Sequence, residues 1–115
     1  MELKFKELIK TLAKKGGLEI ILLLKDGAKR WSFVEQNVGD KKSVSYRIRE
    51  LANLGIIKIG VVHDTPQGTK LYELTPLGKK IIQHIEEMER EFEEYHRKHS
   101  FPDTVEEFIN EELEE

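Results

Sequence analysis

No cysteine occurs among the 115 residues, which excludes disulfides, thiolate metal sites and thiol-based redox sensing. Long apolar runs are missing too, because the longest, residues 20–24, is far shorter than the roughly 20 residues that cross a bilayer. The first residues also lack the pattern of a signal peptide. We therefore expect a cytoplasmic protein that does not bind membranes.

Signatures of catalysis are absent as well. The sequence has no glycine-rich phosphate loop, no nucleophile elbow and no paired carboxylates at a fixed spacing. His96 and His99 lie three residues apart and could chelate a metal, but both fall at the end of an apolar row described below. We interpret them as the polar end of that row, and we expect neither an enzyme nor a bound metal or cofactor.

What is present fits one small globular domain with a single core. Hydrophobic residues make up 38% of the chain and charged residues 36%, which is too apolar for a disordered protein. Abundant Lys and Glu, with few Asn, Gln and Met, lean towards the composition of a thermophile.

The net charge of −3 hides a division along the chain. Residues 1–80 carry 16 Lys and Arg against 9 Asp and Glu, whereas residues 81–115 carry 3 against 13. A basic part can bind a polyanion such as nucleic acid, and an acidic part would be repelled by it. We expect a DNA-binding domain over residues 1–80 and an acidic helical dimerisation extension over residues 81–115. Two differently solvated helical surfaces would produce the same pattern.

The pattern of residues 40–55 predicts one amphipathic helix around which the fold is organised. Asp40 can cap its N-terminus, and Gly55 can adopt the left-handed conformation that ends a helix. Val44, Ile48 and Leu51 recur at helical spacing and should be buried together. The opposite face has almost no acid and should be exposed. It carries side chains that reach phosphates and base edges: Lys42, Ser45, Tyr46, Arg49 and Asn53.

The other elements follow from periodicity and turn residues. We expect helices at residues 2–14 and 18–25, an extended piece at 29–31, strands at 57–61 and 71–74, and a helix after Thr75 and Pro76. Ser32 and Glu35 have the spacing of a capping box, which predicts a short helix over residues 33–37. A helix-turn-helix followed by a hairpin is the order of a winged helix. The expected fold class is α+β, mostly helical, a winged helix-turn-helix with C-terminal dimerisation helices.

Three stretches resemble winged-helix regulators of the HxlR type, and more loosely those of the MarR, ArsR and PadR types. They read GAKRWSFVEQ at residues 27–36, SYRIRELANLGIIK at 45–58 and KLYELTPLGKKI at 70–81. The resemblance spans residues 18 to about 85, and its most diagnostic part is YELTPLG. It implies a DNA-binding transcriptional regulator, most often a repressor. The chain differs from the HxlR-type redox sensors in having no cysteine near its N-terminus, so the resemblance does not indicate the inducing signal.

The winged-helix arrangement assigns candidate DNA contacts to the recognition helix, to the turns beside it and to the hairpin loop. Arg49 is best suited to read a base, because its planar guanidinium can bond O6 and N7 of guanine together. Cations near helix starts and turns usually contact phosphates instead. The full set of candidates is Lys29, Arg30, Lys41, Lys42, Ser43, Ser45, Tyr46, Arg49, Asn53, His63, Thr65, Gln67, Thr69 and Lys70.

A heptad row on the helix after the hairpin predicts a homodimer, because a lone helix cannot bury such a row. The row consists of Ile81, Ile85, Met88, Phe92, Tyr95 and His99. A last short helix should add Val105, Phe108 and Ile109 to the same interface. Packing of the row back on its own domain, most simply on the first helix, is the alternative. A dimer would set two recognition helices about 34 Å apart and read a pseudo-palindrome.

Two other functions fit the same residues. The winged helix can be a protein-interaction module whose basic face is idle, or an architectural protein that binds double-stranded DNA without sequence preference. Trp31, Phe33 and Tyr72 could line a pocket for an unknown small-molecule effector, although aromatic residues at such positions more often belong to the core.

Overall fold

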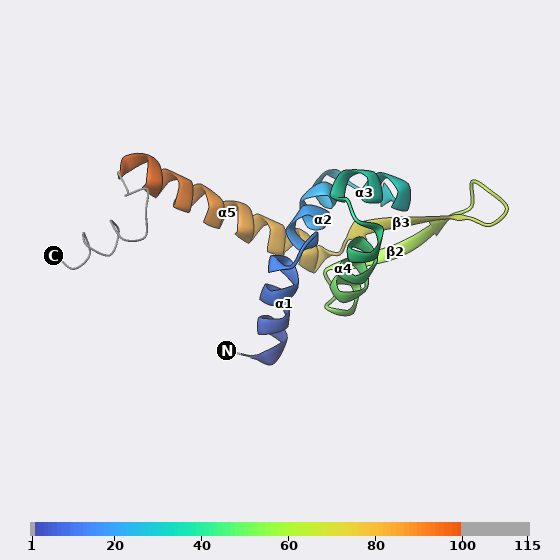
Figure 1. Ribbon diagram of the computed structural model, residues 1–115, viewed down its shortest axis with the longest axis horizontal. Helices are drawn as coiled ribbons and strands as arrows, with labels where there is room; N and C mark the ends of the chain where they lie inside the picture. Colours follow the sequence, from blue (N-terminus) through green and yellow to red (C-terminus); the bar gives the residue numbers. More distant parts are fainter. Residues whose placement is uncertain (1, 100–115) are drawn as a thin grey trace. The chain divides into compact units, whose positions relative to one another are not determined.

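Five helices and three short strands make up residues 2–99, the part of the chain that the computed structural model describes (Figure 1). Their order is α1 (Leu3–Ala13), α2 (Gly17–Leu23), β1 (Lys29–Arg30), α3 (Trp31–Val38), α4 (Lys41–Asn53), β2 (Ile57–Val62), β3 (Thr69–Leu74) and α5 (Pro76–Lys98), with a 3₁₀ turn at Leu24–Asp26. Contacts divide the chain after Gln83 into two compact units, so α5 begins in the first unit and continues into the second. Within these residues no helix has both the length and the apolar character needed to span a membrane.

The core of the first unit lies where α2, α3 and α4 pack on one another. Removing a Leu or Ile side chain from water contributes about 1.5–3 kcal/mol, so this core sets the position of α4. Its fully buried members are Ile20, Ile21, Leu24, Val34, Val44, Leu51 and Ile56.

Helix α4 has the start and the buried side that its sequence predicts. The Asp40 carboxylate accepts a hydrogen bond from the Ser43 backbone N–H at 3.3 Å and thereby caps the helix. Val44 and Leu51 are inaccessible to solvent, and Ile48 is nearly so. Helix α4 is therefore held by one face, and its other face is left for solvent or a ligand.

A close approach of α1 and α2 requires glycine at residue 17. A Cβ atom there would overlap the carbonyl oxygen of Thr11 and the backbone of Leu12. Thr11 and Leu12 are themselves buried. This tight turn lets α1 pack on α2 and also contact α4.

The three strands form an antiparallel sheet in the order β1-β3-β2. β2 and β3 form the wing, residues 57–74, which projects from the helices with its loop at the far end (Figure 1). The register sets Ile59 opposite Tyr72 in the wing and Arg30 opposite Leu71 between β1 and β3. The start of α3 is thus joined to the central strand of the sheet.

Helix α3 begins at Trp31, two residues before the start that the capping box predicts. Arg30 occupies the N-cap position with extended backbone, and no side chain caps the helix. The pairing of Arg30 with Leu71 of β3 sets this extended backbone, so the helix starts directly after the strand. Ser32 lies within the first turn of α3, and the prediction of a capping box from Ser32 and Glu35 is wrong.

Thr75 caps α5 as predicted, and Pro76 is its first residue. The Thr75 hydroxyl accepts from the Gly78 backbone N–H at 3.0 Å and donates to the Gly55 carbonyl at 2.5 Å. The Thr75 backbone N–H donates to the Ile56 carbonyl at 3.0 Å. Gly55 has φ of +78°, the left-handed conformation predicted for it. The two ends of the wing therefore meet at one hydrogen-bonded base.

In the second unit, α5 continues with its predicted apolar row open to solvent. Met88, Phe92 and Tyr95 are 64%, 61% and 52% exposed, and Ile85 is half-buried. Among the other predicted interface residues, Ile81 in the first unit is half-buried and His99 lies just beyond the end of the helix. Val105, Phe108 and Ile109 lie outside the described residues.

Candidate nucleic-acid interface

Helix α4 turns a face of cations and hydroxyls away from the core. Tyr46 and Arg49 stand on this face one turn apart, with the Arg49 guanidinium 5.9 Å from the centre of the Tyr46 ring. Arg49 is exposed, so its guanidinium is accessible for the bidentate recognition to which its planar donors are suited. A shallow groove runs along the face, lined by Asp40, Lys41, Lys42, Ser45, Tyr46 and Arg49.

A second groove lies beside the first, between the start of α3, helix α4 and the wing. Ser45 lines both grooves, so the two adjoin. The second groove is lined by Arg30, Trp31, Ser32, Ser45, Gly68, Thr69, Lys70 and Tyr72. We call the residues that line these two grooves the α4–wing surface. It brings together predicted DNA contacts from three separate stretches of sequence: the start of α3, helix α4 and the wing.

Asp64 in the wing loop binds two of these predicted contacts. Its Oδ2 lies 2.6 Å from Nη2 of Arg30, and its Oδ1 accepts from the Thr69 hydroxyl at 2.7 Å. These interactions, the hydrogen bond from Thr69 first, hold the pKa of Asp64 below its usual value. Sequence reasoning missed Asp64, because its partner Arg30 comes to it only through the pairing of β1 with β3.

Ser43, another predicted contact, is engaged at the start of α4. Its hydroxyl donates to Oδ2 of Asp40 at 2.7 Å, in addition to the bond from its backbone. The hydroxyl bond is the largest cause that lowers the pKa of Asp40. Asp40 is therefore ionised at neutral pH, and its carboxylate is bonded to the first turn of α4.

The remaining predicted contacts lie beside the α4–wing surface or away from it. Lys29 places its Nζ 5.2 Å from the centre of the Phe33 ring. Asn53, in the last turn of α4, lines grooves on the α1 side of the helix, so the structure does not bring it together with the others. The wing-loop residues His63, Thr65 and Gln67 are exposed beyond the grooves.

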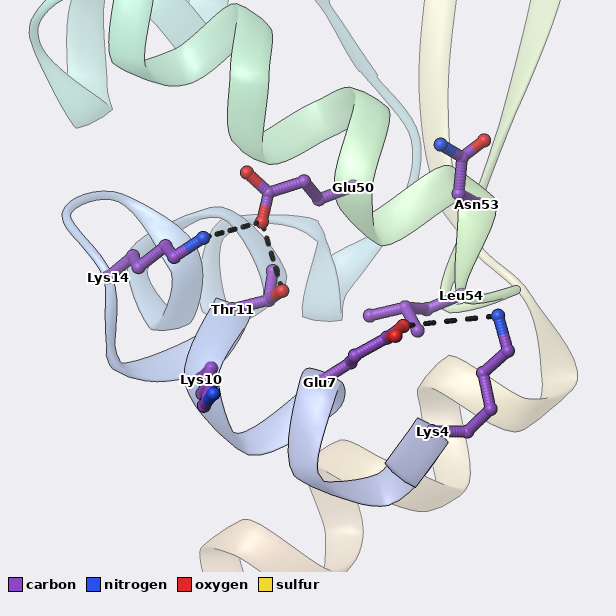
Figure 2. A pocket seen from close by; sticks show the side chains of 8 residues that line it. All are labelled: Lys4, Glu7, Lys10, Thr11, Lys14, Glu50, Asn53 and Leu54. Carbon is purple, nitrogen blue, oxygen red and sulfur yellow. Dashed lines mark hydrogen bonds and ion pairs between the residues drawn. The ribbon is translucent and has the colours of Figure 1, made fainter. Parts of the chain in front are cut away.

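On its other side, helix α4 is fastened to α1 by a second group of polar side chains. Glu50 of α4 points toward α1 (Figure 2), where its Oε2 accepts from the Thr11 hydroxyl at 3.0 Å and lies 3.4 Å from Lys14 Nζ. Its Oε1 lies 3.0 Å from Nη2 of Arg47, whose side chain is only 14% exposed. We call Thr11, Lys14, Arg47 and Glu50 the α1–α4 junction. Sequence reasoning missed this junction.

The three aromatic residues considered for an effector pocket are not gathered in one place. The rings of Trp31 and Tyr72 lie 6.0 Å apart, and both residues line the second groove. Burial of Tyr72 raises the pKa of its hydroxyl, so it stays protonated. Phe33 is exposed beneath Lys29 and does not line that groove.

Comparison with protein families gives one assignment for most of the chain. The family model described as HxlR-like helix-turn-helix matches residues 11–100. This range contains the whole α4–wing surface and all of α5. No curated protein sequence matches the chain significantly.

Solved structures share the winged helix-turn-helix fold. Diamide-treated YodB from B. subtilis is 27% identical, with a TM-score of 0.68 over 78% of this chain and 90% of that chain. A structure described as a MarR-family transcriptional regulator from Enterococcus faecalis V583 is 20% identical, with a TM-score of 0.74 over 82% and 86%. The regulator ytfH from Salmonella typhimurium is 23% identical, with a TM-score of 0.65 over 77% and 80%. The predicted α+β, mostly helical winged helix-turn-helix and the predicted resemblance are confirmed, while the dimerisation role of the C-terminal helices stays a prediction.

Proposed function

The chain belongs to the HxlR-like helix-turn-helix family, and on this premise we propose that it represses transcription by binding a pseudo-palindromic DNA site as a homodimer. Its fold is that of the MarR and HxlR transcriptional regulators. The observation that carries the proposal is the α4–wing surface, where cations and hydroxyls from α4, the start of α3 and the wing adjoin.

The proposed complex places α4 in the major groove. In a helix-turn-helix the N-terminal half of the recognition helix meets base edges, and in α4 this half carries Lys42, Ser45 and Tyr46, followed by Arg49. Arg49 reads a guanine through O6 and N7. Lys41 and Lys70 contact phosphates, and the loop of the wing lies along the adjacent minor groove or backbone.

Exposed apolar rows support the proposed homodimer. Met88, Phe92 and Tyr95 of α5 are more than half exposed, flanked by acidic residues that cannot be buried without partners. On α1, Leu3 and Ile9 are also exposed. A second copy of the chain is the simplest partner that covers such rows, and its two-fold symmetry would match a DNA site with dyad symmetry.

Binding should be strongly dependent on salt. If the dimer neutralises about 6–10 phosphates, its affinity falls by about 10³ to 10⁵ between 50 and 200 mM salt, because each contact releases condensed counterions.

Selection of duplexes from a random pool with purified protein tests the proposal. The expected result is a consensus of two inverted half-sites whose centres lie about one helical turn apart. Equal affinity for selected and random duplexes would indicate architectural binding instead. Failure to shift any duplex at micromolar protein and low salt would indicate a protein-interaction module.

Sedimentation tests the dimer separately. The wild-type chain should sediment as a dimer, and Ile85→Lys combined with Phe92→Lys should give a monomer with an intact winged helix. A wild-type monomer at high concentration would refute the dimer without touching the proposal of DNA binding.

A further inference from the structure

We propose that Asp64 limits the affinity of the protein for DNA, because it holds the Arg30 guanidinium in the free protein and keeps a fixed negative charge next to the α4–wing surface, where Arg30 lies. This inference rests on the proposed function. Arg30 and Lys70 would attract phosphate, whereas Asp64 would weaken that attraction.

The first observation is the place of the ion pair. Arg30 lines the second groove together with Ser45, Thr69 and Lys70, so a phosphate that binds Lys70 there comes close to Arg30. In the structure, however, Nη2 of Arg30 already forms an ion pair with Oδ2 of Asp64 at 2.6 Å. A cation that is already paired releases fewer counterions when it meets phosphate, so Arg30 adds less to binding than an unpaired cation would.

The second observation is that Asp64 is fixed independently of Arg30. Its other carboxylate oxygen accepts from the Thr69 hydroxyl at 2.7 Å, at the first residue of β3. If DNA attracts Arg30, Asp64 remains tied to Thr69 and does not swing into solvent. Its charge then lies near the incoming phosphate and repels it.

The third observation is the exposure of the pair. The Arg30 side chain is 52% exposed and that of Asp64 31% exposed. Exposed ion pairs contribute little to stability, because water screens both charges. A phosphate can therefore displace Asp64 from Arg30, and the pair sets the affinity instead of preventing binding.

The test compares wild type with Asp64→Asn on a selected duplex. Asparagine keeps an oxygen that can accept from Thr69 but removes the charge. The expected result is tighter binding by about threefold to tenfold per protomer at low salt, which is the effect of one charge a few ångströms from a phosphate. The slope of log affinity against log salt should steepen by about 0.9 for each Arg30 released.

The matched control is Glu73→Gln. Glu73 of β3 forms an ion pair with Lys58 at 2.9 Å, and neither residue lines the α4–wing surface, whereas the partner of Asp64, Arg30, does. Glu73→Gln removes the same charge from the wing as Asp64→Asn and should change affinity by less than about twofold. An equal gain from Glu73→Gln would reduce the effect of Asp64 to overall charge and overturn the inference.

A double-mutant cycle tests whether Asp64 acts through Arg30. Arg30→Ala should cost the wild type less affinity than Lys70→Ala does, and less than Arg30→Ala costs the Asp64→Asn variant, because in that variant Arg30 is no longer paired. Unchanged or weaker binding by Asp64→Asn, with wild type still binding, would overturn the inference alone, since Asp64 would then position Arg30 for DNA. Absence of binding by both proteins on every duplex would overturn the proposed function and this inference together.

Discussion

Two acids of the first unit, Glu50 and Asp64, each accept a hydrogen bond from a threonine and pair with an arginine, yet their surroundings differ. Glu50 takes its bond from Thr11, which is buried, and its arginine is only 14% exposed. Asp64 takes its bond from Thr69 in the wing, and its arginine is 52% exposed. The two acids are equally exposed, at 31%, but the threonine and arginine that bind Glu50 are largely buried, whereas the arginine that binds Asp64 is on the surface.

Burial decides what each arrangement does. At the α1–α4 junction, Thr11 and Arg47 have little access to water that could replace a lost partner, so breaking the network should lower the free energy of unfolding. In the wing, water can solvate either partner, so breaking the pair should hardly affect stability and should change what the surface binds. Substitutions at the α1–α4 junction and in the α1–α2 turn should therefore change stability, whereas substitutions in the wing and on the exposed side of α4 should change DNA binding.

The largest effect is expected from Gly17→Ala. The new Cβ would overlap the backbone of Thr11 and force α1 and α2 apart, which should lower the free energy of unfolding by about 3 kcal/mol or more. The matched substitution in the wing is Gly60→Ala, whose Cβ would meet nothing within 4 Å. It should leave stability unchanged or raise it by up to about 1 kcal/mol. Urea denaturation measures both, and equal effects at the two glycines would contradict the comparison.

Glu50→Ala should come next. It leaves the Thr11 hydroxyl and the largely buried Arg47 without their acid, at a cost of about 2–3 kcal/mol. Asp64→Ala removes the equivalent acid from the wing and should leave the denaturation midpoint nearly unchanged. The same urea titrations test this pair of variants. A larger loss at Asp64 than at Glu50 would reverse the assignment of stability to the junction.

Arg49→Ala should act on binding and spare the fold. It should remove discrimination at one base position of each half-site, worth about 1–3 kcal/mol, without changing the unfolding free energy. Lys41→Ala is the control, because loss of a phosphate contact should weaken all sequences alike. Selections with each variant measure the difference. The same consensus from wild type and Arg49→Ala would refute the base-reading role.

Acid titration should show the smallest effect. The pKa of Asp40 is lowered, chiefly by the Ser43 hydroxyl, so the unfolded chain binds a proton more readily than the folded chain does. The stabilisation is fully present above the unfolded pKa of about 3.8 and is lost as the pH falls through the lower, folded value. Asp40→Asn keeps a capping oxygen but cannot titrate.

Asp40→Asn should therefore be slightly less stable than the wild type at pH 7, and this difference should shrink below about pH 4, because the neutral side chain loses nothing on acidification. Unfolding free energies measured between pH 3 and pH 7 test this. Glu73→Gln is the comparison variant, because it removes from the wing a second carboxyl group whose pKa is lowered in the fold. An acid limb as steep as that of the wild type would show that the cap does not titrate as described.

Local patterns in the sequence were enough to predict α4 and the wing. The Asp40 cap bonds to a residue three positions on, and Val44, Ile48 and Leu51 fall on one side of a helix whatever surrounds it. Thr75 likewise bonds to Gly78 within its own turn. Such features depend on neighbours along the chain, so periodicity and turn chemistry identify them.

Features that depend on distant neighbours escaped prediction. The hydroxyl that Glu50 accepts from lies 39 residues away, and Asp64 meets Arg30 only because β1 pairs with β3. The same pairing moved the start of α3 ahead of the capping box at Ser32. Asn53 was assigned to the DNA face by helical angle alone, but at the last turn of α4 the neighbouring α1 decides which groove it lines.

The hydrogen bonds of Thr75 join the chain just after the wing to the chain just before it. Its hydroxyl and backbone tie residue 75 to residues 55 and 56, so the chain returns to its starting point after the hairpin. Lengthening or shortening the hairpin beyond that base changes the entropy of loop closure only slowly and need not move α4 or α5. The wing is therefore the part of this fold that can be exchanged or resized while the helices on either side keep their places.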